Sequence, residues 1–169
     1  MYNEETKRNN ELIWASVFIA EINKQHGLDY VLVPERGENS PVDMYAVSRS
    51  DRAPQLQLQL THAVELPIMA YEKPVSAHYT KHPTIEAIER KYEKLTHQGV
   101  DLAKLILVIQ GYMNHETAEI VFADEVFAKY RSYLFKGIYY VAPSMMSGDT
   151  DESLQEGYVV AIKDAFKLP

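Results

Sequence analysis

Cysteine is absent from the 169 residues of this chain. Disulfides, thiolate metal sites and cysteine nucleophiles are therefore excluded. The chain also lacks a run of about 18 apolar residues, which a membrane-spanning helix would need. Its first residues, MYNEETKRNNE, have no apolar stretch typical of a signal peptide. We therefore expect a cytoplasmic protein that does not enter a membrane.

Positive charge is in short supply. Lysine and arginine number 17 against 24 acidic residues, which gives a net charge of −7. A protein that covers duplex phosphates with its whole surface would normally be basic. The acidic balance argues against that mode of binding, but it leaves room for an enzyme with one local basic groove.

Three common catalytic or nucleotide-binding motifs are missing as well. No GxxxxGK[ST], GxGxxG or GxSxG segment occurs, so phosphate-cradling loops and serine hydrolases have no support. What remains is an ordinary globular composition, with 46% hydrophobic and 24% charged residues. The length is typical of one domain.

Hydrophobic periodicity and turn residues predict a mixture of helices and strands. We expect helices over 4–25, 84–97 and 116–134, with Thr84 as the cap of the second, and strands over 30–34, 42–48, 55–63, 103–110 and 137–142. Residues 158–166 fit either a last strand or a short helix, and 66–83 read as a long irregular segment. A hairpin followed by crossover helices predicts an α/β fold with a mixed central sheet flanked by helices.

The strand over 55–63 alternates between glutamine and leucine. Gln57 and Gln59 should face one way, whereas the leucines and His62 should face the core. A glutamine face is equally consistent with solvent exposure and with a site. We expect His62 to be a core histidine.

Three short segments resemble the restriction-endonuclease-like, or PD-(D/E)xK, nuclease superfamily. Pro41-Val-Asp43 resembles its PD element, Gln57-Leu-Gln59 lies where (D/E)-x-K would lie, and Glu11 resembles an acidic residue of the first helix. The order of elements over residues 4–142 is also similar to the αβββαβ core of that superfamily, with an added helix and strand. The resemblance implies a single restriction-endonuclease-like domain over 1–169, with residues 143–169 as a C-terminal extension.

The resemblance implies a nuclease that hydrolyses phosphodiester bonds of DNA with Mg²⁺. Its catalytic residues would be Asp43, Gln57, Gln59 and Glu11, and its metal ligands would be Asp43 and Gln57. The sequence departs from the superfamily pattern because Gln57 replaces a carboxylate and Gln59 replaces a lysine. In some members the acid or the lysine has migrated to the following helix.

That helix, over 84–97, offers Glu86, Glu89, Arg90, Lys91, Glu93 and Lys94 as migrated groups, although such residues also fit a solvated helix face. The alternative function is a catalytically inactive nuclease-fold protein that acts as a binding or assembly module, for example as a homodimer. An unrelated α/β fold with a small-molecule pocket is a third interpretation.

A weakly basic segment adds candidates for nucleic-acid contacts. They are Lys73 and Lys81, with Tyr71 and Tyr79 interleaved for base stacking. Lys91, on the following helix, is a third candidate. His78 and His82 have the spacing of a helical metal site, but no HExxH frame surrounds them. An ordinary surface loop is the simpler explanation of both observations.

Overall fold

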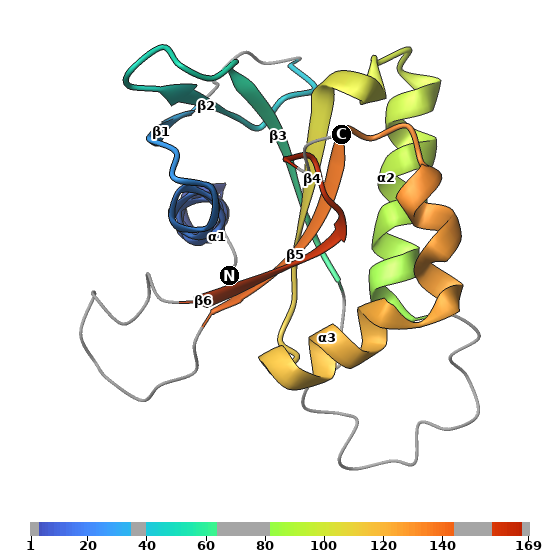
Figure 1. The fold of residues 1–169 in the computed structure, drawn as a ribbon. Helices are drawn as coiled ribbons and strands as arrows, with labels where there is room; N and C mark the ends of the chain where they lie inside the picture. The colour runs from blue at the N-terminus through green and yellow to red at the C-terminus, as the bar shows by residue number, and fades with distance from the viewer. Residues whose placement is uncertain (1–3, 35–39, 64–81, 144–156, 167–169) are drawn as a thin grey trace.

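The computed structural model describes residues 4–34, 40–63, 82–143 and 157–166 (Figure 1). Its helical elements are α1 (Glu4–His26), α2 (Pro83–His97), η3 (Leu102–Lys104), α3 (His115–Ala123) and η4 (Glu125–Ser132), of which η3 and η4 are 3₁₀ helices. Its strands are β1 (Tyr30–Pro34), β2 (Met44–Ser48), β3 (Leu56–His62), β4 (Leu105–Gln110), β5 (Gly137–Pro143) and β6 (Gly157–Lys163). The described residues form an α/β fold, as predicted.

All six strands belong to one mixed sheet in the order β1-β2-β3-β4-β5-β6. The first three strands form an antiparallel meander, β3, β4 and β5 run parallel, and β6 returns antiparallel to β5. Residues 158–166, which by sequence fit either a strand or a short helix, therefore begin within a strand, β6, over 157–163. It forms an edge of the same sheet rather than a separate appendage.

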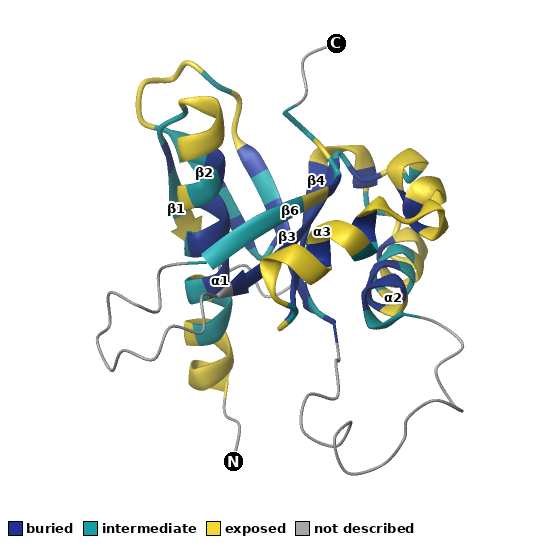
Figure 2. Ribbon diagram, turned by 60° about the horizontal axis from the view of Figure 1, so that its bottom comes forward, coloured by how far each residue is buried: buried dark blue, intermediate teal, exposed yellow. Residues whose placement is uncertain are grey.

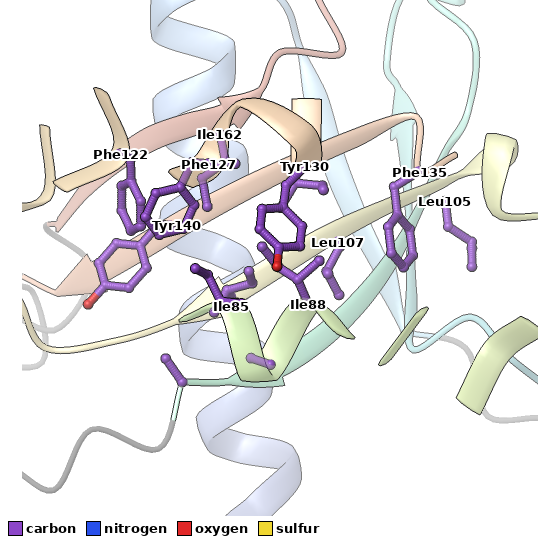
Figure 3. Close-up of a cluster of buried hydrophobic side chains, with 14 of the residues drawn as sticks. Ile85, Ile88, Leu105, Leu107, Phe122, Phe127, Tyr130, Phe135, Tyr140 and Ile162 are labelled. Carbon is purple, nitrogen blue, oxygen red and sulfur yellow. The ribbon is translucent and has the colours of Figure 1, made fainter. Parts of the chain in front are cut away.

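Helices cover both faces of the sheet (Figure 1). On one face α1 packs against the leucine side of β3, through Phe18, Ile22, Leu56 and Leu58. On the other face α2, α3 and η4 enclose an aromatic-rich cluster around Tyr130 and other buried side chains (Figure 3). The six residues of β4 are all buried, since this central strand is covered on both sides (Figure 2).

Two helix boundaries differ from the prediction. The expected helix over 116–134 is broken at Asp124, whose extended backbone and side chain, bonded to the Val126 amide at 2.9 Å, begin η4. Aspartate competes with helical hydrogen bonds in this way because its short side chain reaches nearby amides. Thr84 is not the cap of α2. The cap is His82, whose Nδ1 accepts from the Thr84 amide at 3.1 Å, while Thr84 itself is buried.

The β2–β3 hairpin determines which residues meet at the start of β2. Its turn contains Asp51 at a φ of 56°, and its register pairs Met44 with Leu58. Only three residue pairs join the two strands, so β3 continues past the beginning of β2.

Among the described residues, no helix combines the length and apolar character that a membrane crossing requires.

Candidate functional site

A polar cleft of about 870 Å³ lies where β3 extends beyond β2. Its walls come from the N-terminal half of α1, the segment before β2, β3, α2 and the segment that leads into β4. All four predicted catalytic residues line it: Glu11, Asp43, Gln57 and Gln59. The structure therefore brings together side chains that come from one helix and two strand regions.

Asp43 lies directly before β2 and extends the hairpin by one step. Its amide donates to the Leu58 carbonyl at 2.9 Å. Its carboxylate Oδ2 accepts from the Leu60 amide at 2.7 Å and from Gln59 Nε2 at 2.8 Å. Because β2 has not yet begun opposite Leu60, the Asp43 side chain takes the place of the missing strand partner for that amide.

Two carboxyl groups in the cleft resist ionisation. Burial raises the pKa of Asp43, although the Leu60 amide and the positive charge of Lys91 act in the opposite direction. Burial also raises the pKa of Glu11, and the negative charge of Asp43 adds to that effect. Lys7, with its Nζ 4.0 Å from Glu11 Oε1, offsets it in part. Desolvation and like charge are the usual causes of such shifts.

Gln59 is a buried amide with one unsatisfied atom. It is buried in the wall of the cleft, with only 5% of the residue exposed. An ionised carboxylate only accepts hydrogen bonds, so the amide nitrogen must face Asp43. Oε1 then has no hydrogen-bond partner among the described residues. Buried oxygens are rarely left unpaired, and an amide oxygen is a ligand for hard cations.

The glutamine side of β3 is therefore not a solvent-exposed face. Gln59 and Thr61 are buried, and Gln57 is half-buried and lines the same cleft. α2 packs against β3 on this side of the sheet (Figure 1).

Lys91 extends from α2 into the cleft and is half-buried. Burial lowers its pKa, and the negative charges of Asp43 and Glu11 oppose that shift. The predicted nucleic-acid contact is thus a cation next to the two acids. Among the other candidates on this helix, Glu86 is exposed and outside the cleft lining, whereas Glu89 accepts the Tyr130 hydroxyl at 2.7 Å.

His62 is not the core histidine that the alternation predicts. It is half-buried and lines the cleft, because it lies on the part of β3 that extends past its pairing with β2. Burial and the nearby charges of Lys7, Arg90 and Lys91 lower its pKa. Arg90 holds this strand end to α2, with Nη2 3.2 Å from the His62 carbonyl and 3.4 Å from Thr61 Oγ1.

The sequence predictions missed two other lysines, Lys7 and Lys104, which line the cleft. The only available signal for Lys7 was its position one helical turn before Glu11. Lys94, one of the charged residues considered on the 84–97 helix, lines the cleft as well. Lys73, Lys81, Tyr71, Tyr79 and His78 lie outside the described residues. His82 caps α2, which uses its Nδ1.

In the portions of the chain that the structure covers, no three histidine, aspartate or glutamate side chains come together as metal ligands. The four predicted residues give the cleft two carboxylates, from Glu11 and Asp43, and two side-chain amides, from Gln57 and Gln59. Further oxygen donors in its lining are those of Ser40, Thr61, Gln98 and Asp101. Comparison of the chain with family models, curated proteins and solved structures finds no match, so the functional argument rests on this geometry.

Proposed function

We propose that the chain is a divergent member of the PD-(D/E)xK nuclease superfamily, which hydrolyses phosphodiester bonds of DNA in the cleft around Asp43. The order α1, a three-strand meander, α2, β4, α3 and β5 supports this proposal because it agrees with the element order of that superfamily. The six-stranded sheet adds β6 as an extra edge strand.

One observation carries the proposal: a half-buried lysine and two carboxyl groups share a cleft with the Gln-x-Gln segment. Lys91 approaches from α2 the region where the superfamily lysine would extend from β3, and Gln59 occupies that strand position. Glu11 provides a second acid, which Gln57 does not. The cleft thus contains the charge types of the family pattern, but on different elements.

The residues present fit a magnesium ion, although sparsely. Mg²⁺ is usually bound through one or two carboxylates and keeps several waters, so a full protein cage is not required. Asp43 and Glu11 would hold it, and the unpaired Oε1 of Gln59 is a suitable third oxygen. When bound, Mg²⁺ would lower the pKa of a water molecule and neutralise phosphate charge.

The side chains of the cleft have separate tasks in this proposal. Gln59 and the Leu60 amide fix Oδ2 of Asp43, which orients the carboxylate. Lys91 places a positive charge beside the acids, where it attracts the phosphate and stabilises negative charge that develops during hydrolysis. Arg90 anchors α2 to the end of β3 and so positions Lys91.

A second function has its own support. Gln57 in the carboxylate position and the absence of a three-ligand group among the described residues favour a protein that keeps the fold without hydrolysis. Such a protein would act as a binding or assembly module.

Cleavage of plasmid and of labelled oligonucleotides in Mg²⁺ or Mn²⁺ tests the hydrolytic proposal. Asp43→Ala should abolish metal-dependent cleavage. Asp29→Ala, which removes a carboxylate outside the cleft, should preserve it. Absence of metal-dependent cleavage by the native protein, or equal cleavage by both variants, would reject the nuclease and leave the binding module as the better explanation.

A further inference from the structure

The residues that line the cleft have a positive net charge, whereas the rest of the molecule has a negative one. Four of the 17 basic residues line it, as lysines, together with only three of the 24 acidic residues. The rest of the chain is therefore strongly acidic, and an anion approaching the protein meets attraction at this cleft.

Three of these lysines follow one wall of the cleft. Lys91 and Lys94 are three residues apart on α2 and share one helix face, and Gln98 continues that face past the end of the helix. Lys104 lies beyond it, in η3. At a rise of about 1.5 Å per residue, the distance from Lys91 to Gln98 is roughly 10 Å. We refer to Lys91, Lys94 and Lys104 as the lysine row.

The row begins next to the acids and leads away from them. Lys91 lowers the pKa of both Asp43 and Glu11, and Lys94 lowers that of Asp43. The side chains of Lys94 and Lys104 are exposed. Lys104 has a partner, Asp101, with a separation of 3.7 Å. Lys94 forms no ion pair within the described residues, so its charge is the most available for a ligand.

The remaining lining indicates how a ligand is recognised. No aromatic ring of tyrosine, phenylalanine or tryptophan lines the cleft among the described residues. Bases therefore find no stacking surface of the kind used by many single-strand binding proteins. A nucleic-acid strand carries a regular series of phosphate charges, which a series of lysines along one wall can meet.

We propose that the lysine row binds consecutive phosphate groups of a nucleic-acid strand, independently of base sequence, on one side of the Asp43 position. This inference rests on the proposed function, because it places the rest of the substrate backbone relative to the bond that is hydrolysed. The strand runs along α2 toward Lys104, and its bases point away from the lysine row.

Binding of fluorescein-labelled single-stranded oligonucleotides in EDTA, followed by anisotropy at several salt concentrations, tests this inference without hydrolysis. Lys94→Ala should weaken binding by about 5- to 10-fold near 0.1 M salt, and should reduce the salt slope by roughly 0.7. The loss should be similar for oligothymidine and for a mixed sequence. Lys94→Arg should restore affinity.

Lys24→Ala is the matched control, because Lys24 also lies in the last turn of an exposed helix end but outside the cleft. Both lysines favour their helix C-terminus, so this effect on helix stability is the same in the two variants. Thermal unfolding of each variant checks that the fold is retained.

Equal affinity of the Lys94→Ala and Lys24→Ala variants, a preference for one base sequence, or no oligonucleotide binding by the native protein would overturn the lysine row. Metal-dependent cleavage with no dependence of binding on Lys94 rejects the row and leaves the hydrolytic proposal. Lys94-dependent binding without cleavage has the opposite meaning: the row stands and the nuclease fails.

Discussion

An aspartate lies beside each end of β2, and the pKa values of the two shift in opposite directions. Asp29, which precedes β1 in the chain, contacts the last residue of β2. It accepts the Ser48 hydroxyl at 2.6 Å and the Ser50 amide at 2.9 Å, and these bonds lower its pKa. Asp43, at the beginning, also accepts two hydrogen bonds, yet burial raises its pKa. The first carboxylate suits a structural turn, whereas the second is retained in a place that disfavours its charge.

This difference agrees with the proposal that Asp29 is a structural acid and Asp43 a functional one. A neutral side chain could accept the Leu60 amide at the Asp43 position without the desolvation of a charge. The negative charge beside Glu11 is therefore better explained by a cation that enters the cleft than by the needs of the hairpin. The expected effects of changing the two ends follow, from the largest to the smallest.

Lys91→Gln should have the largest effect on the Asp43 end. Removing a positioned charge from a catalytic site commonly costs about 100-fold or more in rate. The acidic limb of the pH profile for cleavage should also move to higher pH, because Lys91 lowers the pKa of Asp43 and of Glu11. Initial cleavage rates over a pH series measure both effects. A lower rate with an unchanged profile would mean that Lys91 does not act through these acids.

Gln57→Glu should make the cleft a better cation site. The substitution adds a carboxylate to those of Asp43 and Glu11, so Mg²⁺ affinity should rise by about 10-fold or more. Without metal, the added charge should decrease thermal stability, because it joins two acids whose ionisation is already disfavoured. Calorimetric titration with Mg²⁺ and thermal unfolding in EDTA give the two readings. A variant with unchanged Mg²⁺ affinity would show that Gln57 does not contribute to a cation site.

Asp43→Asn should stabilise the metal-free fold while it removes activity. The pKa of Asp43 is raised in the folded state, so the folded protein binds a proton that the unfolded chain has already lost. Native stability therefore falls as the pH rises from the unfolded pKa through the folded one, and asparagine escapes this loss. We expect a gain on the order of 1 kcal/mol at neutral pH, or about 3 °C in the unfolding midpoint.

The gain from Asp43→Asn should disappear in acid, at a pH low enough that the Asp43 carboxyl group is protonated in both the folded and the unfolded chain. Unfolding in urea at a series of pH values in EDTA measures it. A variant that is less stable at every pH would identify Asp43 as a structural cap of the hairpin.

Asp29→Asn should have the smallest effect, and its sign should be opposite. The pKa of Asp29 is lowered in the folded state, so its contribution to stability is present above the unfolded pKa and is lost as the pH falls through the folded value. The variant should be slightly less stable at neutral pH and equal to the native protein in strong acid. The same urea series provides the comparison, and a stabilised Asp29→Asn variant would remove the contrast between the two ends.

The part of the site formed by the hairpin could be predicted from the sequence. Strict alternation over 55–63 and a hairpin turn centred near Asp51 predict that Asp43 lies opposite Gln59. The observed register, with Met44 opposite Leu58, agrees with this expectation. Such local patterns are reliable because a slip of one residue would expose the leucine face.

The part formed by helix packing could not be predicted in the same way. Lys91 lies in a helix segment with charges on several sides. Periodicity alone does not tell which of these charges enters the cleft. His62 continues the leucine alternation, but it lies on the part of β3 that extends past β2, where the cleft opens. The break at Asp124 depends on one local side-chain bond rather than on apolar periodicity.

Binding of Mn²⁺ to the two aspartate variants tests the central claim most directly. Paramagnetic Mn²⁺ titration of the native protein should show a bound ion, and this binding should be lost in Asp43→Asn and retained in Asp29→Asn. Equal binding of Mn²⁺ by both variants, or no binding by the native protein, would contradict the account of Asp43 as the anchor of a cation-binding hydrolytic cleft.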